Sequence, residues 1–146
     1  IAHKSRDNAR TPMPWNDEEN AGFTTGTPWI PLNPNFKEIN VQEQLSRSDS
    51  VFHYYQKLIS IRKTNDIVVY GDYHLLCEDD ETIFAYTRTL GNEQLLVVCN
   101  FSTEDRKFDF GQFAQDNVKI LISNSSIDPR KSGVMSAYGA IVLKID

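Results

Sequence analysis

Three side chains whose types suit chemistry, Arg6, Asp7 and Arg10, are closely spaced near the start of this sequence. A guanidinium offers several N–H donors in a fixed planar fork and stays charged at physiological pH. Such a group either binds the oxygens of a polar ligand or pairs with a carboxylate and holds a loop in place. The residue type alone leaves both roles open for Arg10.

Carboxylates follow shortly afterwards, at Asp17, Glu18 and Glu19. General acid catalysis needs a carboxyl group whose pKa is raised by burial or by a neighbouring negative charge. These three residues are adjacent, and nothing around them indicates burial. We therefore expect solvated loop charge here rather than a catalytic pair.

The chain has two cysteines and three histidines. His3, His53 and His74 share no ligand-type spacing with one another or with the cysteines, so we expect no metal site and no cofactor. Cys77 and Cys99 each lie in a strand-like apolar run. This favours two buried thiols in a reducing, cytoplasmic compartment over a disulfide between adjacent strands.

Composition indicates one folded domain, or a small domain with part of another. The 146 residues are 40% hydrophobic and 11% aromatic, which is enough for a packed core. The net charge is −5 and the basic residues are scattered, so we expect no nucleic-acid partner. No apolar run approaches the roughly 18 residues that cross a bilayer, so we expect no membrane partner. Because residue 1 is Ile, we expect the native N-terminus to lie upstream or to have been removed.

We expect little regular secondary structure in the first part of the chain. Prolines are dense over residues 10–36, which predicts one long loop that stays ordered only if its aromatic rings are buried. Two helices should follow. One is short, with its N-cap at Asn40 and its end near Arg47, and the other is amphipathic and runs from about Ser50 to Lys63.

From Ile67 onward the apolar residues alternate with a period of two, which predicts strands. Several short strands with polar connectors and no long helix between them indicate an antiparallel β-sandwich. The positions that mark the strands are Val69, Gly71, Tyr73 and Leu75; Ile83, Ala85 and Thr87; Leu95, Val97 and Cys99; Val118, Ile120 and Ile122; Ile141, Leu143 and Ile145. The predicted fold class is therefore mainly β, with a sandwich over residues 67–146. Residues 1–66 have too little regular structure for a core of their own and need a partner.

Several motifs, in their order and spacing, resemble one enzyme family. Ser5-Arg6-Asp7-Asn8-Ala9-Arg10-Thr11-Pro12-Met13-Pro14-Trp15 resembles a signature of the α-amylase superfamily of glycoside hydrolases, in its oligo-1,6-glucosidase and dextran glucosidase group. Later motifs are similar to the same group: Asn20-Ala21-Gly22-Phe23-Thr24, Val69-Tyr70-Gly71-Asp72-Tyr73, Ile83-Phe84-Ala85-Tyr86-Thr87-Arg88 and Cys99-Asn100-Phe101-Ser102. The resemblance is close up to about residue 110 and loose beyond it.

The resemblance implies a (β/α)8 barrel followed by an antiparallel C-terminal domain. Residues 1–66 would be the C-terminal edge of the catalytic barrel, with a loop over the active site and the last helices, and residues 67–146 the C-terminal β-sandwich. The family's retaining mechanism uses two carboxyl groups about 5–5.5 Å apart. These come from barrel strands whose motifs are absent here. We therefore expect a C-terminal fragment that has no catalytic residue and is inactive alone.

By resemblance, Arg10 binds the hydroxyls of the glucose at the non-reducing end of the substrate. Arg6 and Asp7 are expected to brace the loop, with a position beside the sugar as the alternative. Pro14 departs from the family, which usually has Gln there.

The parent protein implied by this resemblance hydrolyses terminal α-1,6-glucosidic bonds of short, isomaltose-type oligosaccharides, so its partners would be that substrate and the missing barrel. Trehalose-6-phosphate hydrolysis and sucrose isomerisation are neighbouring specificities. A non-catalytic β-sandwich module that binds carbohydrate or a protein partner is the alternative function. Trp15 and Trp29 could stack on a sugar, but we favour packing against the barrel.

Overall fold

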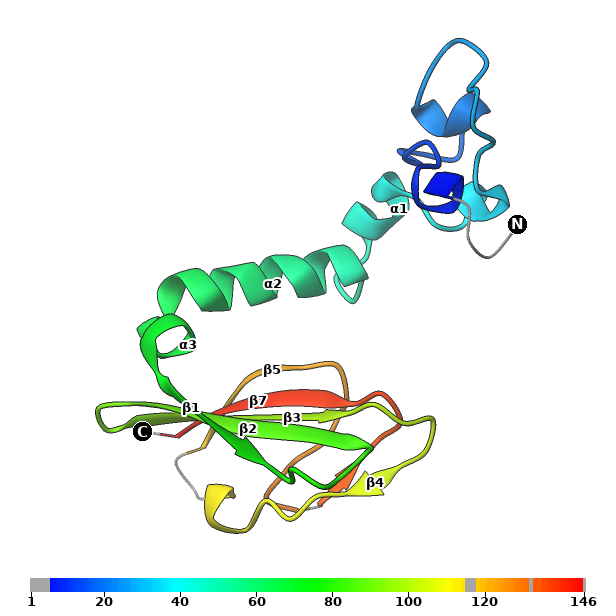
Figure 1. Ribbon diagram of the computed structural model, residues 1–146. Helices are drawn as coiled ribbons and strands as arrows, with labels where there is room; N and C mark the ends of the chain where they lie inside the picture. The colour runs from blue at the N-terminus through cyan, green and yellow to red at the C-terminus, as the bar shows by residue number, and fades with distance from the viewer. Residues whose placement is uncertain (1–5, 115–117, 132, 146) are drawn as a thin grey trace. The chain divides into compact units, whose positions relative to one another are not determined.

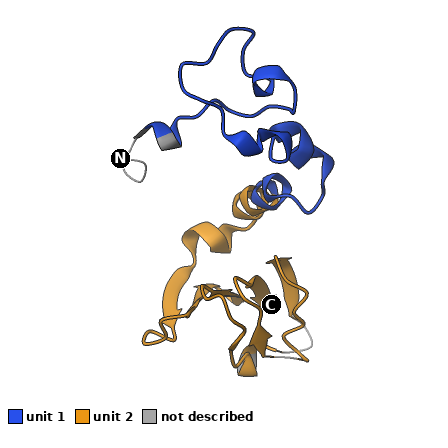
Figure 2. Cartoon of the chain, turned by 90° about the vertical axis from the view of Figure 1, so that its right-hand side faces the viewer, with its two compact units in different colours: residues 1–56 blue, residues 57–146 orange. Residues whose placement is uncertain are grey.

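Figure 1 shows the computed structural model, in which residues 6–114, 118–131 and 133–145 are described. The chain divides into two compact units, residues 1–56 and residues 57–146 (Figure 2). Within the described ranges, no helix is both long and apolar enough to cross a bilayer.

The first unit consists of short helical turns joined by extended loops. Single 3₁₀ turns at Arg6–Ala9 (η1), Glu19–Gly22 (η2) and Pro34–Lys37 (η3) precede the α-helix α1, Val41–Ser46. The long proline-rich loop is thus confirmed apart from these turns. Its rings are not buried within this chain, since Trp15 and Phe23 are about half exposed and Trp29 is almost fully exposed.

Helix α1 begins at the predicted cap. The Asn40 side-chain Oδ1 accepts a hydrogen bond from the Glu43 N–H at 2.9 Å, and its Nδ2 donates to the Phe36 carbonyl at 2.9 Å. An N-cap asparagine satisfies one of the free N–H groups at a helix start. The second predicted helix is α2, Val51–Thr64, and none of its residues is buried. Its predicted apolar face is therefore uncovered within the part of the chain that the structure describes.

The second unit is built on a five-stranded antiparallel sheet with strand order β1-β2-β3-β7-β5. Its strands are β1 (Asp72–Leu76), β2 (Ile83–Leu90), β3 (Glu93–Asn100), β7 (Ala140–Ile145) and β5 (Lys119–Ser123). A two-stranded sheet of β4 (Arg106–Lys107) and β6 (Val134–Met135), with the 3₁₀ helix η4 (Gly111–Phe113), forms the second layer. The predicted antiparallel sandwich is confirmed.

The core lies between these two layers. One face of the large sheet contributes Ile83, Ala85, Leu96, Val98, Ile141 and Leu143, and the second layer contributes Phe108, Phe110, Phe113 and Met135. Burial alternates along β2 as predicted, with Ile83, Ala85 and Thr87 buried while Phe84 is exposed. The core-facing and outward-facing residues of the sheet therefore form two distinct surfaces.

The first predicted strand begins too early. Residues Asp66–Tyr70 form a short helix, α3, and β1 starts only at Asp72. The reason is a contact from far along the chain, because the Arg88 guanidinium donates to the carbonyl oxygens of Ile67 at 3.1 Å and Gly71 at 2.6 Å. Carbonyls at the C-terminal end of a helix lack internal partners, and a guanidinium can satisfy several at once.

The expectation of two buried thiols is also wrong. Both cysteines are free, but Cys77 is exposed and only Cys99 is half-buried. Cys77 follows β1 with a left-handed backbone, φ 52°, and its carbonyl accepts the Asp80 N–H at 2.9 Å. The apolar run thus ends in a turn before it reaches Cys77.

Candidate functional site

The loop that carries the proposed sugar-binding residue is fixed at its middle. The backbone N–H groups of Val41 and Gln42 each donate at 3.0 Å, to the carbonyls of Pro14 and Trp15 respectively. These donors belong to the first turn of α1, where N–H groups have no partner inside the helix. Pro14 lacks an N–H, but the bond it makes here needs only its carbonyl, so the departure from the family's Gln preserves this anchor.

A left-handed turn holds the loop from its other side. Asn20, Ala21 and Gly22 have successive φ values of 53°, 56° and 64°. Such a conformation costs roughly 1–2 kcal/mol for each residue with a Cβ. The carbonyl of Ala21, which is fully buried, accepts the N–H groups of Trp15 at 2.8 Å and Asn16 at 3.3 Å.

The side chain of Asn20 extends this bracing along the loop. Its Nδ2 donates to the carbonyls of Thr24 at 3.2 Å and Gly26 at 3.1 Å. Glycine is favoured at position 22 because its φ is 64°; a Cβ there would also lie 2.6 Å from the Asn16 side chain, which would have to move. The sequence interpretation includes Asn20 only within the Asn20-Ala21-Gly22-Phe23-Thr24 motif and not as a residue that braces the loop. The Asn-Ala-Gly tripeptide carried a signal, since Asn and Gly adopt positive φ most readily.

Arg10, expected to bind the substrate, and Arg6 and Asp7, expected to brace the loop, lie at or just before the start of this loop. Arg10 is exposed, and its backbone N–H donates to the Asp7 carbonyl at 3.1 Å. Within the described part of the chain, the Arg10 guanidinium has no hydrogen-bond or ion-pair partner. The side chain of Arg6 lies outside the described residues, and Asp7 is exposed. The substrate role of Arg10 and the bracing roles of Arg6 and Asp7 therefore stay predictions.

No catalytic acid is found among the carboxyl groups with shifted pKa values. Asp49, Asp80 and Asp128 all have pKa values below the ordinary range. Backbone N–H donors, first that of Ile83, lower the pKa of Asp80, whereas a neighbouring arginine lowers the other two. A general acid needs the opposite shift. Asp17, Glu18 and Glu19 are exposed, as expected of loop charge.

Metal binding has no support in the described ranges, where His, Cys, Asp and Glu residues form no group of three that could hold an ion. Within the described residues, the first unit presents the Arg10 guanidinium without a hydrogen-bond or ion-pair partner, on a loop whose backbone is held by α1 and by the turn at Asn20. Such a group suits recognition of a polar ligand rather than bond cleavage.

Two protein families match this chain in succession. Residues 1–71 match the alpha amylase catalytic domain, and residues 73–141 match the maltogenic amylase C-terminal domain. The oligo-1,6-glucosidase of Parageobacillus thermoglucosidasius is 59% identical over 129 residues, which cover 88% of this chain and 23% of that protein.

Solved structures give the same result. Trehalose-6-phosphate hydrolase from Bacillus licheniformis is similar with a TM-score of 0.88 and 46% identity, over 97% of this chain and 26% of that one. Isomaltulose synthase from Klebsiella sp. LX3 is similar with a TM-score of 0.84 and 40% identity, over the same two shares. The chain spans about a quarter of the length of these relatives. It belongs to the α-amylase superfamily, in the group that contains the oligo-1,6-glucosidases, and joins the end of a catalytic-domain match to a C-terminal β domain.

Proposed function

We propose that this chain is the C-terminal part of a retaining α-glucosidase that hydrolyses terminal α-1,6-glucosidic bonds of short, isomaltose-type oligosaccharides. The observation that carries the proposal is the 59% identity to an oligo-1,6-glucosidase across both matched regions. In this proposal the reacting carboxyl groups belong to the barrel outside this chain. The chain contributes a substrate-binding arginine and a stabilising domain.

Arg10 is the residue in this chain that would act on the substrate. Its guanidinium is charged, exposed and without a partner in the described part of the chain, so binding a sugar would break no existing bond. One charged hydrogen bond to a hydroxyl contributes roughly 1.5–3 kcal/mol once water is excluded. The backbone bonds at Pro14, Trp15 and Ala21 keep the loop ordered before substrate arrives, which lowers the entropic cost of binding.

Trehalose-6-phosphate hydrolysis is the second candidate, because a hydrolase of that substrate has a TM-score of 0.88 to this chain. The experiment is a substrate panel on the intact protein: isomaltose, trehalose-6-phosphate and sucrose, compared by kcat/KM. The proposal expects isomaltose to be preferred at least tenfold. A preference for trehalose-6-phosphate would establish the second candidate, and no turnover of any of the three would overturn both.

A further inference from the structure

A short segment with two prolines connects Arg10 to the braced part of its loop. Its residues are Thr11, Pro12, Met13 and Pro14. Just before the segment, the Arg10 N–H donates to the Asp7 carbonyl at 3.1 Å. Just after it, the Trp15 N–H donates to the Ala21 carbonyl at 2.8 Å. Both ends are therefore fixed, and we call residues 11–14 the spacer.

Hydrogen bonds do not hold the first three residues of the spacer. In the part of the chain that the structure describes, Thr11, Pro12 and Met13 make no hydrogen bond, and they belong to no helix or strand. A segment of ordinary residues without such bonds would sample several backbone conformations. Another restriction must therefore keep Arg10 at a constant position relative to the braced loop.

Proline provides this restriction. Its ring fixes φ near −65°, and it disfavours the helical region for the residue before it. Because the prolines stand at positions 12 and 14, each residue of the spacer is either a proline or the residue before one. Proline-rich segments behave as semi-rigid connections. The spacer is therefore stiff although its first three residues make no hydrogen bonds.

The two prolines of the spacer have different surroundings. Pro12 is buried, so its replacement would disturb packing as well as stiffness. Pro14 is half-buried, and its carbonyl accepts the Val41 N–H at 3.0 Å. Another residue at position 14 keeps that carbonyl while it loses the ring. Substitution of Pro14 therefore changes the stiffness of the spacer and leaves its anchor on α1 in place.

We propose that Pro14 is a positioning residue for Arg10, because it stiffens the spacer through which the bonds at Trp15 and Ala21 hold the backbone of Arg10 in place. The inference rests on the proposed function, since it takes Arg10 as the group that binds the terminal glucose. Pro14 itself does not contact the sugar in this proposal. A binding group that is ordered before the substrate arrives loses less conformational entropy on binding, so the gain is in affinity.

Pro14→Gln in the intact protein is the first test. Exchange between proline and another residue at a compatible position changes a conformational equilibrium by a factor of about two to five. An ordered loop favours the bound substrate and the transition state equally, so we expect KM for isomaltose to rise about two- to fivefold with kcat unchanged. Pro14→Ala, which introduces no amide group, should give the same result. An unchanged KM in both variants would overturn the proposal.

Pro31→Gln is the matched control. Pro31 is an exposed proline of the same long loop, but it lies beyond the turn at Asn20 and so outside the spacer. We expect this variant to leave KM unchanged. An equal rise of KM in Pro31→Gln and Pro14→Gln would mean that any proline of the loop has this effect, and the proposal would be wrong.

A double-mutant cycle tests whether Pro14 acts through Arg10. If the spacer affects the substrate only by placing Arg10, Pro14→Gln should cause no further rise of KM in the Arg10→Ala protein. A general structural role of Pro14 would instead raise KM by the same factor in both backgrounds. That second result would overturn the proposal even if each single variant weakened binding.

Trypsin cleavage after Arg10 measures the stiffness of the spacer without any assay of activity. Arg10 and Thr11 are both exposed, and proteolysis needs a flexible segment around the bond that is cut. In the intact protein, Pro14→Gln should speed the appearance of the fragment that begins at Thr11 by about two- to fivefold, the same factor as for KM. Pro31→Gln should not change this rate.

The cleavage rate separates the proposal from the proposed function. A protein that hydrolyses isomaltose, but whose Pro14→Gln variant has an unchanged KM and an unchanged cleavage rate, would refute the positioning role and leave the proposed function standing. No turnover of isomaltose, trehalose-6-phosphate or sucrose by the wild type would refute the proposed function, and with it the role of Arg10, whatever the cleavage rate.

Discussion

The guanidinium of Arg88 donates a 2.6 Å hydrogen bond to the carbonyl of Gly71, and so joins the middle of a strand to the last residue of the catalytic-domain match. Gly71 is buried, and a Cβ at this position would lie 2.6 Å from the Ile67 carbonyl oxygen. The backbone can therefore pass this close to α3 only with glycine. This pair fixes the junction between the two matched families.

Removal of Arg88 should loosen this junction. Arg88→Ala leaves carbonyls at the end of α3 without donors, and we expect the free energy of unfolding to fall by about 2 kcal/mol, the order of one charged hydrogen bond. Urea titration of the intact protein measures the loss. Arg88→Met, which keeps most of the apolar stem, should be nearly as destabilising. If Arg88→Met were as stable as the wild type, the hydrogen bonds would not be what holds α3.

Asn100 joins the large sheet to the second layer. Its Nδ2 donates to the carbonyls of Glu104 at 2.8 Å and Ser136 at 2.9 Å, and its Oδ1 accepts the Ser102 N–H at 2.9 Å. Asn100→Ala should lower the free energy of unfolding by about 1–3 kcal/mol, because it removes these hydrogen bonds from a side chain that is only 2% exposed.

Asn100→Asp should be worse at neutral pH than Asn100→Ala, since it places a carboxylate against carbonyl oxygens at a position only 2% exposed. Burial raises the pKa of such a carboxyl in the folded state. The Asp variant should therefore be most stable at acid pH and lose stability as the pH rises. Urea midpoints at pH 4 and pH 7 test this, and a midpoint independent of pH would show that the side chain has turned outward.

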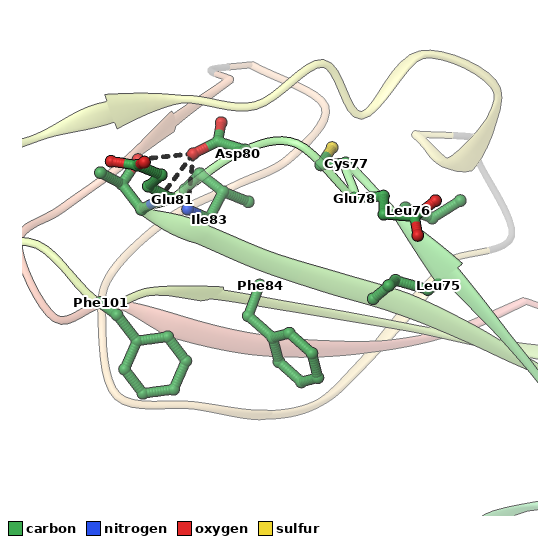
Figure 3. A pocket seen from close by; sticks show the side chains of 10 residues that line it. Leu75, Leu76, Cys77, Glu78, Asp80, Glu81, Ile83, Phe84 and Phe101 are labelled. Carbon is green, nitrogen blue, oxygen red and sulfur yellow. Dashed lines mark hydrogen bonds between the residues drawn. The ribbon is translucent and has the colours of Figure 1, made fainter.

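Asp80 should make the free energy of unfolding increase as the pH rises through its pKa, which is the opposite of the dependence expected for Asn100→Asp. The Oδ1 of Asp80 accepts the N–H groups of Ile83 at 2.9 Å and Thr82 at 2.8 Å (Figure 3), and these bonds lower its pKa in the folded state. The contribution is complete above the unfolded pKa of about 4 and is lost as the pH falls through the lowered folded-state value. The wild type should thus exceed Asp80→Asn in melting temperature at pH 7, with the difference shrinking below pH 4. If the difference in melting temperature between the wild type and Asp80→Asn were the same at all pH values, the charge of Asp80 would make no contribution to stability.

The sequence specified those elements whose signals are local. The Asn40 cap and the alternation along β2 each depend on residues a few positions apart, and both were found. Helix α3 was missed because it depends on Arg88, a residue of a later strand. Strands β4 and β6 were missed because two residues carry no periodicity.

The candidate site likewise has features that local sequence signals predict and features that only the folded structure reveals. The motif pointed to Arg10, but nothing local reveals that the loop is braced by α1 and by the left-handed turn at Asn20. Those bonds join backbone groups across the loop and need its folded path.

Arg10 should matter for catalysis and not for stability. In the intact protein, Arg10→Ala should lower kcat/KM for isomaltose by about 10- to 150-fold, which corresponds to roughly 1.5–3 kcal/mol. Arg10→Lys should retain part of this, because an ammonium keeps the charge but loses the planar fork. Arg130→Ala, at an exposed position of the second unit, is the control for kcat/KM and should leave it unchanged, although it removes the ion pair with Asp128. If Arg10→Ala instead lowered the urea midpoint and left kcat/KM unchanged, Arg10 would be a loop brace.

The most direct test of the account is the mass and activity of the native protein, purified from its source cells through a tag placed after Asp146. If the proposed function holds, the native polypeptide is larger than this chain by at least the roughly 250 residues of a barrel, and it hydrolyses isomaltose. A tagged protein with the mass of the 146 residues alone, without activity on isomaltose, would contradict it.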